Sequence, residues 1–434
     1  MKRVLIITYY WPPSGGSGVQ RWVKFAKYLP SMGFKPVIYT PENPEMTSID
    51  HSLYEDIPKE AEIIKRHITE FYWLYRLLKG HRRGQVKEEN PISGGKKTLM
   101  QKIMLAIRGN VFIPDPRITW RRSSVRFLRK YLKENPVDVI VSTGPPHSMH
   151  LIAKDLSEET SIPWVADFRD PWTKMFNFKY LPLFGWAKKK HGNLEKAVLD
   201  KADFIVSVSP SVAKDFQNMT ETPVELITNG YDEDDFQQVV EEDGYFNITH
   251  TGLLVAGGNP ELLWKLIAQK CRSDEYFDKM VKIRLCGRTD KEVIDSINAA
   301  GLGEKTINLG YQNHNVAVRE QKNASVLILP LRMEPETTAI LPGKLFEYMA
   351  ARKPILCIGL SEGDMADVLK DTGSGKAFDW DDEGMGGFID SCWESFKQGE
   401  DTSEDLDIDK YSRKTLTAQM ASLLKKVSEK DRYE

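Results

Sequence analysis

Short apolar segments and amphipathic helical segments alternate along almost the whole chain, and this alternation limits the folds it can adopt. The first apolar segment covers residues 4–8, a loop rich in proline and glycine covers residues 11–18, and a helical pattern runs over residues 19–32. A second strand is expected over residues 36–39. A strand, a glycine loop, a helix and another strand form a βαβ unit, which is typical of doubly wound parallel sheets.

The alternation continues in two series, which predicts two α/β domains. In the first series we expect further strands at 137–142, 164–167 and 204–209 and a helix at 147–157. In the second we expect strands at 248–251, 282–286, 306–309, 326–330 and 355–358, with helices near 260–270, 290–299, 315–323, 342–351 and 364–370. Apolar strands that alternate with helices indicate parallel sheets covered on both faces.

Composition and turn signals suggest where these domains begin and end. An acidic, turn-rich segment at residues 229–235 separates the two series. We therefore expect an N-terminal domain over residues 1–225 and a second domain of similar size over residues 226–410, with a cleft between them. The remaining residues, 411–434, contain an amphipathic stretch that we expect to cross back onto the N-terminal domain.

Charge is distributed unevenly between the two halves. The whole chain has 60 basic and 62 acidic residues, a net charge of −2, which argues against a nucleic-acid-binding protein. Residues 1–225 carry a net charge of +11, and the rest carry −13. Residues 66–133 contain 17 basic and 4 acidic residues and match neither series, so we interpret them as an insertion in the N-terminal domain. Such an insertion could rest on an anionic membrane surface, or be a solvated helical pair that binds nothing.

Cysteine usage and hydropathy indicate where the protein works. The four cysteines are far apart and form no CxxC pair, so neither a disulfide framework nor a metal site is expected. The apolar run at the N-terminus is too short for a signal peptide, and no stretch approaches the roughly 20 apolar residues of a membrane span. We therefore expect a cytoplasmic protein, with any membrane contact peripheral, on the inner face of the plasma membrane.

The first loop contains the sequence Gly15, Gly16, Ser17 and Gly18 between a strand and a helix. Glycines there let backbone N–H groups approach a phosphate, and the helix N-terminus adds favourable charge. The spacing is not the dinucleotide fingerprint, and no lysine follows as in a P-loop. A tight turn without a ligand is the alternative.

Two neighbouring strands of the first series are expected to end in polar residues. His147 follows the strand at 137–142, and Asp167, Arg169 and Asp170 follow the next one. Open α/β sheets bind ligands at the carboxyl ends of their strands. These four residues are therefore candidate catalytic groups that could position a sugar hydroxyl and take its proton. The alternatives are a self-contained ion-pair network and a histidine that only begins a helix.

The segment at residues 337–351 is the most informative. Pro342 and Gly343 form a good first helical turn, and Lys344 and Glu347 then lie on one face. A phosphate at the helix N-terminus and a carboxylate that binds a ribose diol would suit this arrangement. A surface pair between Lys344 and Glu347 would also explain it.

These motifs together resemble glycosyltransferase family 4, especially bacterial members that build capsular or lipid-linked polysaccharides. The resemblance rests on the Gly loop, on Asp-Phe-Arg-Asp-Pro-Trp at 167–172, Thr-Asn-Gly-Tyr-Asp at 228–232, Thr-His-Thr-Gly at 249–252, Pro-Gly-Lys-Leu-Phe-Glu-Tyr-Met-Ala at 342–350 and Arg-Lys-Pro-Ile at 352–355. It covers nearly the whole chain except the basic insertion.

The resemblance implies a GT-B fold, in which two Rossmann-like domains face each other across a cleft. It implies a retaining, metal-independent transfer of a hexose from a UDP- or GDP-linked sugar, with no further cofactor, to a glycan or lipid-linked acceptor in surface polysaccharide synthesis. Carried over by motif, the residues that would bind the donor are Gly16, Gly18, Arg288, Tyr311, Gly343, Lys344 and Glu347. Glu347 would hold the ribose, Lys344 and Gly343 the diphosphate, and Tyr311 would lie near the base. The acidic pair Asp379 and Asp381 is interpreted as solvated surface.

Two positions depart from the family's pattern. Ala339 stands where many members have a second Glu, and Leu253 stands where the family often has an Arg. Arg288 is a possible replacement for that Arg. These departures keep open a binding protein with a degenerate site, and a nucleotide-sugar epimerase of the same fold is another alternative.

Overall fold

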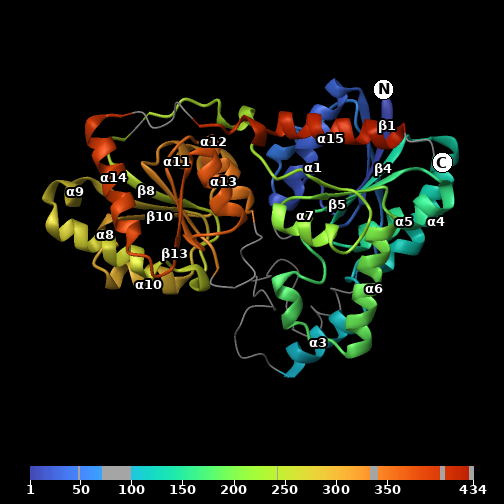
Figure 1. The fold of residues 1–434 in the computed structure, drawn as a ribbon, viewed down its shortest axis with the longest axis horizontal. Helices are drawn as coiled ribbons and strands as arrows, with labels where there is room; N and C mark the ends of the chain where they lie inside the picture. Colours follow the sequence, from blue (N-terminus) through green and yellow to red (C-terminus); the bar gives the residue numbers. More distant parts are fainter. Residues whose placement is uncertain (47–48, 71–98, 242, 333–340, 401–405, 430–434) are drawn as a thin grey trace. The chain divides into compact units, whose positions relative to one another are not determined.

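The computed structural model divides the chain into two compact units. Unit 1 comprises Met1–Ile227 together with Thr417–Glu434, and unit 2 comprises Thr228–Leu416. The structure describes all residues except 47–48, 71–98, 242, 333–340, 401–405 and 430–434 (Figure 1). The chain therefore passes between the units twice, after Ile227 and after Leu416.

Unit 1 is built on a parallel sheet. Its described strands form a seven-stranded sheet in the order β3-β2-β1-β4-β5-β6-β7. The strands are β1 (Lys2–Ile7), β2 (Phe34–Pro41), β3 (Glu62–Arg66), β4 (Val139–Gly144), β5 (Trp164–Phe168), β6 (Phe204–Ser207) and β7 (Val224–Leu226). The chain runs outward from β1 to β3 and then returns to β4 on the other side of β1. The carboxyl ends of β1 and β4 thus lie at the point where the strand order reverses, where such sheets bind ligands.

Helices cover both faces of this sheet (Figure 1). The described helices of unit 1 are α1 (Ser17–Tyr28), α3 (Leu99–Asn110), α4 (Ile118–Glu134), α5 (Ser148–Thr160), α6 (Gly185–Lys201) and α7 (Pro210–Gln217), and most of α15 (Arg413–Ser428) belongs to it as well. Because helices pack on both sides, the central strands have buried side chains on both faces, and residues 4–7 of β1 are completely buried.

Unit 2 repeats the same architecture with its own sheet and core. In the part of the chain that the structure describes, its six strands follow the order β10-β9-β8-β11-β12-β13. They are β8 (Phe246–Thr251), β9 (Val281–Cys286), β10 (Thr306–Gly310), β11 (Val326–Pro330), β12 (Ile355–Gly359) and β13 (Gly375–Asp379). All the strand pairs are parallel, and β8 and β11 are the neighbours at which the order reverses.

Two apolar clusters lie on opposite faces of the unit 2 sheet. One cluster joins the sheet to α8 (Glu261–Ser273), α9 (Glu275–Met280), α10 (Lys291–Ala299) and α14 (Gly384–Gln398). The other joins it to α12 (Gly343–Ala350) and α13 (Asp364–Thr372). α11 (His314–Lys322) precedes β11 and contacts β8 through Gln321. Doubly wound parallel sheets, the fold class expected from the sequence, are confirmed in both units.

Some element boundaries differ from the expected ones for local reasons. α1 ends at Tyr28 because Pro30 interrupts it, and a 3₁₀ turn leads to Gly33 in a left-handed conformation. The short edge strands β3, β7 and β13 were not expected. Asp379 is the last residue of β13 and accepts hydrogen bonds from Ser361, so it is tied into the sheet edge rather than merely solvated.

The basic stretch at 66–133 is not one insertion outside the sheet. Arg66 is the last residue of β3, and α4 packs against the sheet with Trp120 and Leu128 buried. Tyr39 of β2 stacks on Trp120, with ring centroids 4.7 Å apart. Residues 71–98 of this stretch lie outside the described residues. The ends of the stretch therefore pack on the sheet of unit 1. α3 is the described part that lies away from this sheet (Figure 1).

The C-terminal end of α15 packs against β1 and β6 of unit 1. Lys2 Nζ donates to Ser428 Oγ and forms an ion pair with Glu429, each at 2.8 Å, and Lys426 lies over the ring of Phe204. Over the described ranges, no helix combines the length and apolar character needed to cross a membrane.

Candidate functional site

The carboxylate of Glu347 and the ammonium of Lys344 meet at the start of α12. Lys344 Nζ lies 2.7 Å from Glu347 Oε2, and the two side chains are 30% and 13% exposed. The helix begins at Gly343 after Pro342, so its first backbone N–H groups point away from the helix body beside Lys344. A half-buried cation beside a helix N-terminus is a suitable environment for an anion such as a phosphate.

Two further residues hold Glu347 in place. Gln321 of α11 donates from Nε2 to Glu347 Oε2 at 3.2 Å and to Thr251 Oγ1 at 3.0 Å. Thr251 ends β8, and its backbone N–H donates to the hydroxyl of Tyr348 at 2.7 Å. The carboxylate is thus fixed from β8, α11 and α12. Sequence analysis missed Gln321, because a buried glutamine far along the chain has no local signal.

The charges at this position support each other. Burial opposes ionisation of Lys344, but the nearby Glu347 outweighs burial and raises the pKa of Lys344. Burial likewise favours neutral Glu347, but Lys344 and His314 hold the pKa of Glu347 below its usual value. Burial lowers the pKa of His314, but the carboxylates of Asp235, 3.5 Å from its Nε2, and of Glu347 more than compensate and raise it. Both members of the Lys344–Glu347 pair are therefore charged at neutral pH.

Glycines bring the backbone of neighbouring loops close to Lys344. Gly252, directly after β8, has φ 114°, and a Cβ there would lie 3.4 Å from Lys344 Cε. A Cβ on Gly287 would lie only 2.0 Å from the carbonyl oxygen of Gly252. The loops that follow β8 and β9 are therefore packed backbone to backbone, which leaves room for the Lys344 side chain above them.

Two further residues of unit 2 that were predicted to bind the donor lie on these and adjacent loops. Arg288 follows β9, and its carbonyl accepts from the N–H of Leu254 at 2.9 Å. Tyr311 follows β10 and is 74% exposed, and Leu253 is also exposed. Ala339 lies outside the described residues. His250 of β8 is buried, and its Nδ1 lies 3.0 Å from the carbonyl oxygen of Ile328.

In unit 1, Asp167 forms a closed network. Arg21 binds it through Nε and Nη2 at 2.8–3.2 Å, Trp22 donates to it at 2.7 Å, and Thr143 donates at 2.9 Å. Asp167 and Arg21 are both 0% exposed. Every lone pair within reach is used, so this carboxylate is shielded from any substrate. The geometry of Asp167 is that of the self-contained ion-pair network, the alternative given for it from the sequence.

Arg169 has a different environment from Asp167. Its Nη2 donates to the carbonyl oxygen of Pro145, and its guanidinium lies 5.8 Å from the ring centre of Tyr10. A Cβ on Gly18 would lie 2.6 Å from Arg169 Nη1. A side chain at Gly18, in the first turn of α1, would therefore displace the guanidinium of Arg169 from the space next to it. Gly16 precedes this helix with φ 95°, which also favours glycine.

Asp170 is half-buried and makes no hydrogen bond within the described residues. Desolvation raises the pKa of Asp170 to about 6, although the positive charge of Arg169 opposes this shift. A carboxyl group with a raised pKa and no fixed partner is suited to accept or donate a proton near neutral pH.

Two histidines accompany these residues at the carboxyl end of β4. His147 stacks flat on Trp172, with ring centroids 4.8 Å apart, and a Cβ on Gly144 would lie 3.0 Å from its Nδ1 and 2.5 Å from Nε2 of His150. Both nitrogens are buried without a hydrogen-bond partner in the described part of the chain. Desolvation lowers the pKa of His147 well below its usual value and that of His150 to about 3, so both rings are neutral.

The orientation of His150 is set from the strands below it. Trp164 donates from its indole to Ser142 Oγ at 2.8 Å, and Ser142 Oγ lies 2.8 Å from His150 Nδ1. Because indole can only donate, the serine proton is free for Nδ1, and the ring proton then resides on Nε2. His150 thus presents an N–H group toward Gly144. Sequence analysis missed it because a histidine one turn into a helix resembles core packing.

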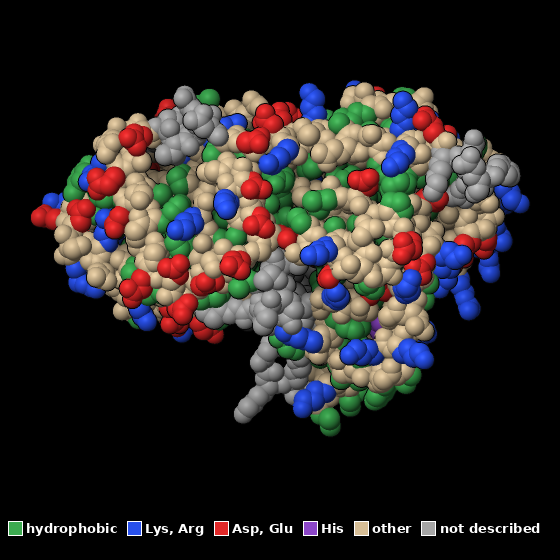
Figure 2. All heavy atoms as spheres, viewed as in Figure 1, with side chains coloured by type: hydrophobic (Ala, Val, Ile, Leu, Met, Phe, Trp, Pro, Cys, Tyr) green, Lys and Arg blue, Asp and Glu red, His purple; other side chains and the backbone are tan. Residues whose placement is uncertain are grey.

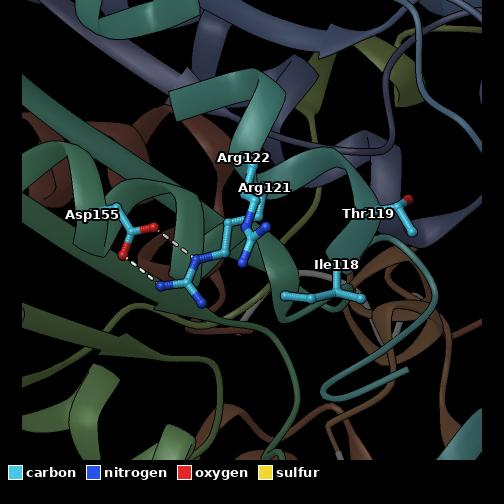
Figure 3. Close-up of a pocket in the computed structure, with 5 residues that line it drawn as sticks. All are labelled: Ile118, Thr119, Arg121, Arg122 and Asp155. Carbon is cyan, nitrogen blue, oxygen red and sulfur yellow. Dashed lines mark hydrogen bonds and ion pairs between the residues drawn. The ribbon is translucent and has the colours of Figure 1, made fainter. Parts of the chain in front are cut away.

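A surface hollow lies elsewhere in unit 1. It has a volume of about 490 Å³ and is lined by Ile118, Thr119, Arg121, Arg122 and Asp155 (Figure 3). Arg121 already forms a two-point ion pair with Asp155, with contacts of 2.7 and 2.6 Å. None of the predicted site residues lines this hollow, and we do not assign it a role.

No group of His, Cys, Asp and Glu suited to hold a metal ion occurs in the ranges that the structure describes. The positive charges near the candidate sites come from side chains instead. They are Lys344 in unit 2 and Arg169 in unit 1, each beside a carboxylate.

Comparison with known proteins supports the family resemblance. Residues 81–235 match the model of the family described as Glycosyltransferase Family 4. No curated protein matches the chain by sequence. Among solved structures, a glycosyltransferase from Rickettsia africae superposes with a TM-score of 0.63 at 12% identity and covers 99% of both chains.

Two other structures span related chemistries. A TarM mutant from S. aureus, solved in complex with Fondaparinux, alpha-GlcNAc-glycerol and UDP, has a TM-score of 0.53 at 10% identity and covers 100% of this chain and 97% of its own. The UDP-GlcNAc 2-epimerase from Methanocaldococcus jannaschii has a TM-score of 0.52 at 11% identity and covers 98% of this chain and 99% of its own.

The chain therefore has the GT-B fold of glycosyltransferases, with two parallel-sheet α/β units. Within the chain, residues 81–235 are similar to glycosyltransferase family 4.

Proposed function

We propose that this chain is a retaining, metal-independent hexosyltransferase that uses a UDP- or GDP-linked sugar and a lipid-linked glycan acceptor in bacterial surface polysaccharide synthesis. The observation that carries the donor part is the fixed Glu347 carboxylate beside Lys344 at the start of α12. A carboxylate held this way can accept hydrogen bonds from both hydroxyls of a ribose. Lys344 and the helix N-terminus can neutralise the charge of a diphosphate.

In this proposal, charge stabilisation drives the reaction. When the sugar leaves, negative charge grows on the diphosphate, and the Lys344 ammonium and the N–H groups at Gly343 are already in place to meet it. Arg288 and Tyr311 would complete the donor site from the loops after β9 and β10, and Gly16 and Gly18 would let the α1 N-terminus approach the phosphates.

We assign the acceptor to unit 1. Asp170 would take the proton of the acceptor hydroxyl, because its pKa of about 6 lies near neutral pH. Arg169 and the neutral His147 would orient the hydroxyl. Asp167, enclosed by Arg21 and Trp22, would position the end of β5 and take no part in the proton transfer. The membrane contact of a lipid-linked acceptor would come from the basic region of the same unit.

A panel of UDP- and GDP-sugars tests the donor part by thermal shift, since a bound donor stabilises the folded protein by mass action. We expect one nucleotide series to raise Tm in wild type and not in Glu347→Ala. The matched control, Glu304→Ala, removes a carboxylate from a loop of the same unit and should leave the shift intact. No stabilisation by any donor would refute the proposed site.

An epimerase acting on the nucleotide sugar alone is the second candidate, because Asp170 and two neutral histidines could exchange a sugar proton. Incubation of the best donor with the purified protein decides between the two. Isomerised sugar nucleotide in the absence of any acceptor would support the epimerase, and transfer that requires an acceptor would support the transferase.

A further inference from the structure

Helix α3 presents its apolar face to solvent. Leu99, Ile103 and Ile107 are spaced four residues apart and therefore lie on one side of the helix. Their exposed fractions are 76% for Leu99, 45% for Ile103 and 46% for Ile107, and the neighbouring Met100 is 48% exposed. A surface helix of a globular protein normally turns such a stripe toward the core. The opposite orientation marks this face as a contact surface.

Two exposed aromatic residues lie beside the end of this helix. Asn110 of α3 binds the segment before α6: its Nδ2 donates to the carbonyl oxygen of Pro182 at 2.8 Å, and its Oδ1 accepts from the N–H of Phe184 at 2.7 Å. Phe184 and Trp186 are 60% and 57% exposed. The α3 face and these two rings form what we call the apolar edge: Leu99, Met100, Ile103, Ile107, Phe184 and Trp186.

The charged residues in the two chain segments that form the apolar edge are all positive. Residues 99–114 and 176–194 contain six lysine and arginine residues and no aspartate or glutamate. Lys102 lies on α3, and Lys188, Lys189 and Lys190 are exposed on the first turns of α6, directly after Trp186. In Figure 2 hydrophobic and basic side chains gather together at the end of unit 1 where Figure 1 places α3.

We propose that the apolar edge inserts into the interface of an anionic lipid bilayer. Aliphatic residues and a tryptophan on one face, with lysines beside them, are what an interfacial helix needs: the apolar side chains enter the acyl boundary, and the lysines meet lipid phosphates. A protein partner of ordinary composition would not require an edge with six cations and no acid. The inference rests on the proposed function only in its choice of partner.

Vesicle co-sedimentation of the full chain tests this inference. The probes are vesicles of phosphatidylcholine alone and of phosphatidylcholine mixed with phosphatidylglycerol. We expect wild type to bind the mixed vesicles, and Ile103→Ser with Ile107→Ser to weaken binding about tenfold or more. Lys188→Gln with Lys189→Gln should weaken it about 25-fold, since each cation near an anionic surface contributes about fivefold.

Matched controls separate this effect from general loss of surface apolarity. Val239 and Ile63 are also exposed, at 95% and 37%, and lie away from the apolar edge in sequence and element. Val239→Ser with Ile63→Ser should leave vesicle binding unchanged. Because all replaced side chains are exposed, each variant should retain the wild-type Tm within about 2 °C.

Three results would overturn the proposal. The first is that wild type and the double variant Ile103→Ser with Ile107→Ser bind vesicles equally. The second is that wild type binds neutral and anionic vesicles equally. The third is that wild type forms a dimer without lipid and the double variant does not. The last result would assign the edge to a second copy of the chain. Calorimetric titration with the donor is independent of lipid, so donor binding without vesicle binding would reject the apolar edge and leave the proposed transferase intact.

Discussion

Asp167 and Arg21 form an ion pair that solvent does not reach, and removing one charge leaves the other buried. We expect Asp167→Asn to lower the free energy of unfolding by about 3–5 kcal/mol, because the Arg21 guanidinium loses its counter-ion. Urea unfolding followed by circular dichroism measures this. The exposed pair between Arg129 and Glu159 is the control, and Arg129→Ala should cost under about 1 kcal/mol. Similar costs for both variants would contradict the structural role of Asp167.

Glu347 should act mainly through donor affinity. A ribose contact is made in the ground state and in the transition state alike, so Glu347→Ala should raise KM for the donor about 10- to 100-fold with a much smaller change in kcat. Gln321→Leu should have a weaker effect of the same kind, because it removes only the support of the carboxylate. A fall in kcat at constant KM would show that Glu347 takes part in the chemical step instead.

Asp170 should produce an acid limb in the pH profile. Its pKa of about 6 means that the carboxylate is charged above that pH and neutral below it, so kcat should fall as pH drops through about 6. Asp170→Asn should lower kcat about 10²- to 10⁴-fold with little effect on donor affinity, and it should abolish the limb. Because the charge of Arg169 favours the ionised form, Arg169→Met should move the limb to higher pH in any activity that remains.

Residues in local motifs were the easier ones to find from sequence. The pattern around Lys344 and Glu347 placed both on one helical face, and the structure pairs them. The same reasoning could not separate Asp167 from Asp170, which are three positions apart but differ entirely in burial and partners. Gln321 and His150 are fixed by contacts between distant elements, which no local spacing reveals.

The close approach of α1 to the loop after β5 is the contact between elements that allows the sharpest test. Gly18→Ala adds a Cβ that would lie 2.6 Å from Arg169 Nη1, so the guanidinium must move. We expect kcat to fall about 10- to 100-fold with almost unchanged stability, since alanine suits a helix.

Gly192→Ala in α6 is the matched control for that substitution. A Cβ there meets nothing within 4 Å, and the residue is likewise helical. This variant should keep wild-type turnover and gain up to about 1 kcal/mol of stability. If the two alanine variants had the same kcat, the proposed role of Arg169 would be wrong.

Most central elements follow from the apolar pattern, and the edges do not. The strand at 326–330 was predicted with the bounds it has, because Ser325 precedes four apolar residues and Pro330 ends them. β3 and β7 are short and half-exposed, and they become strands only because β2 and β6 offer unpaired backbone groups. The sequence pattern placed α4 in an insertion. Its six cations obscure the pattern of the side chains from Trp120 to Leu132 that the structure buries.

At the scale of the whole molecule, unit 1 depends on residues from both ends of the chain. Met420, Leu424 and Val427 of α15 are completely buried. Deletion of residues 417–434 should therefore destabilise unit 1 and leave unit 2 nearly unaffected, because unit 2 has its own two apolar clusters. Hydrogen exchange followed by mass spectrometry measures both units in one sample. Faster exchange in β8–β13 than in β1 and β6 would contradict this expectation.

The charge asymmetry also belongs to the whole chain. A net charge of −2 conceals halves of +11 and −13, and the six cations beside the apolar edge belong to the positive half. Composition alone correctly located the positive half but could not show which residues face outward. That required the exposed fractions of α3 and of the start of α6.

The split composition of unit 1 reverses the usual order of folding during synthesis. A ribosome releases residues 228–416 before it makes 417–434, so unit 2 can close while unit 1 still lacks the helix that covers Lys2 and Phe204. Until that helix emerges, the part of unit 1 that Met420, Leu424 and Val427 cover in the folded protein stays exposed.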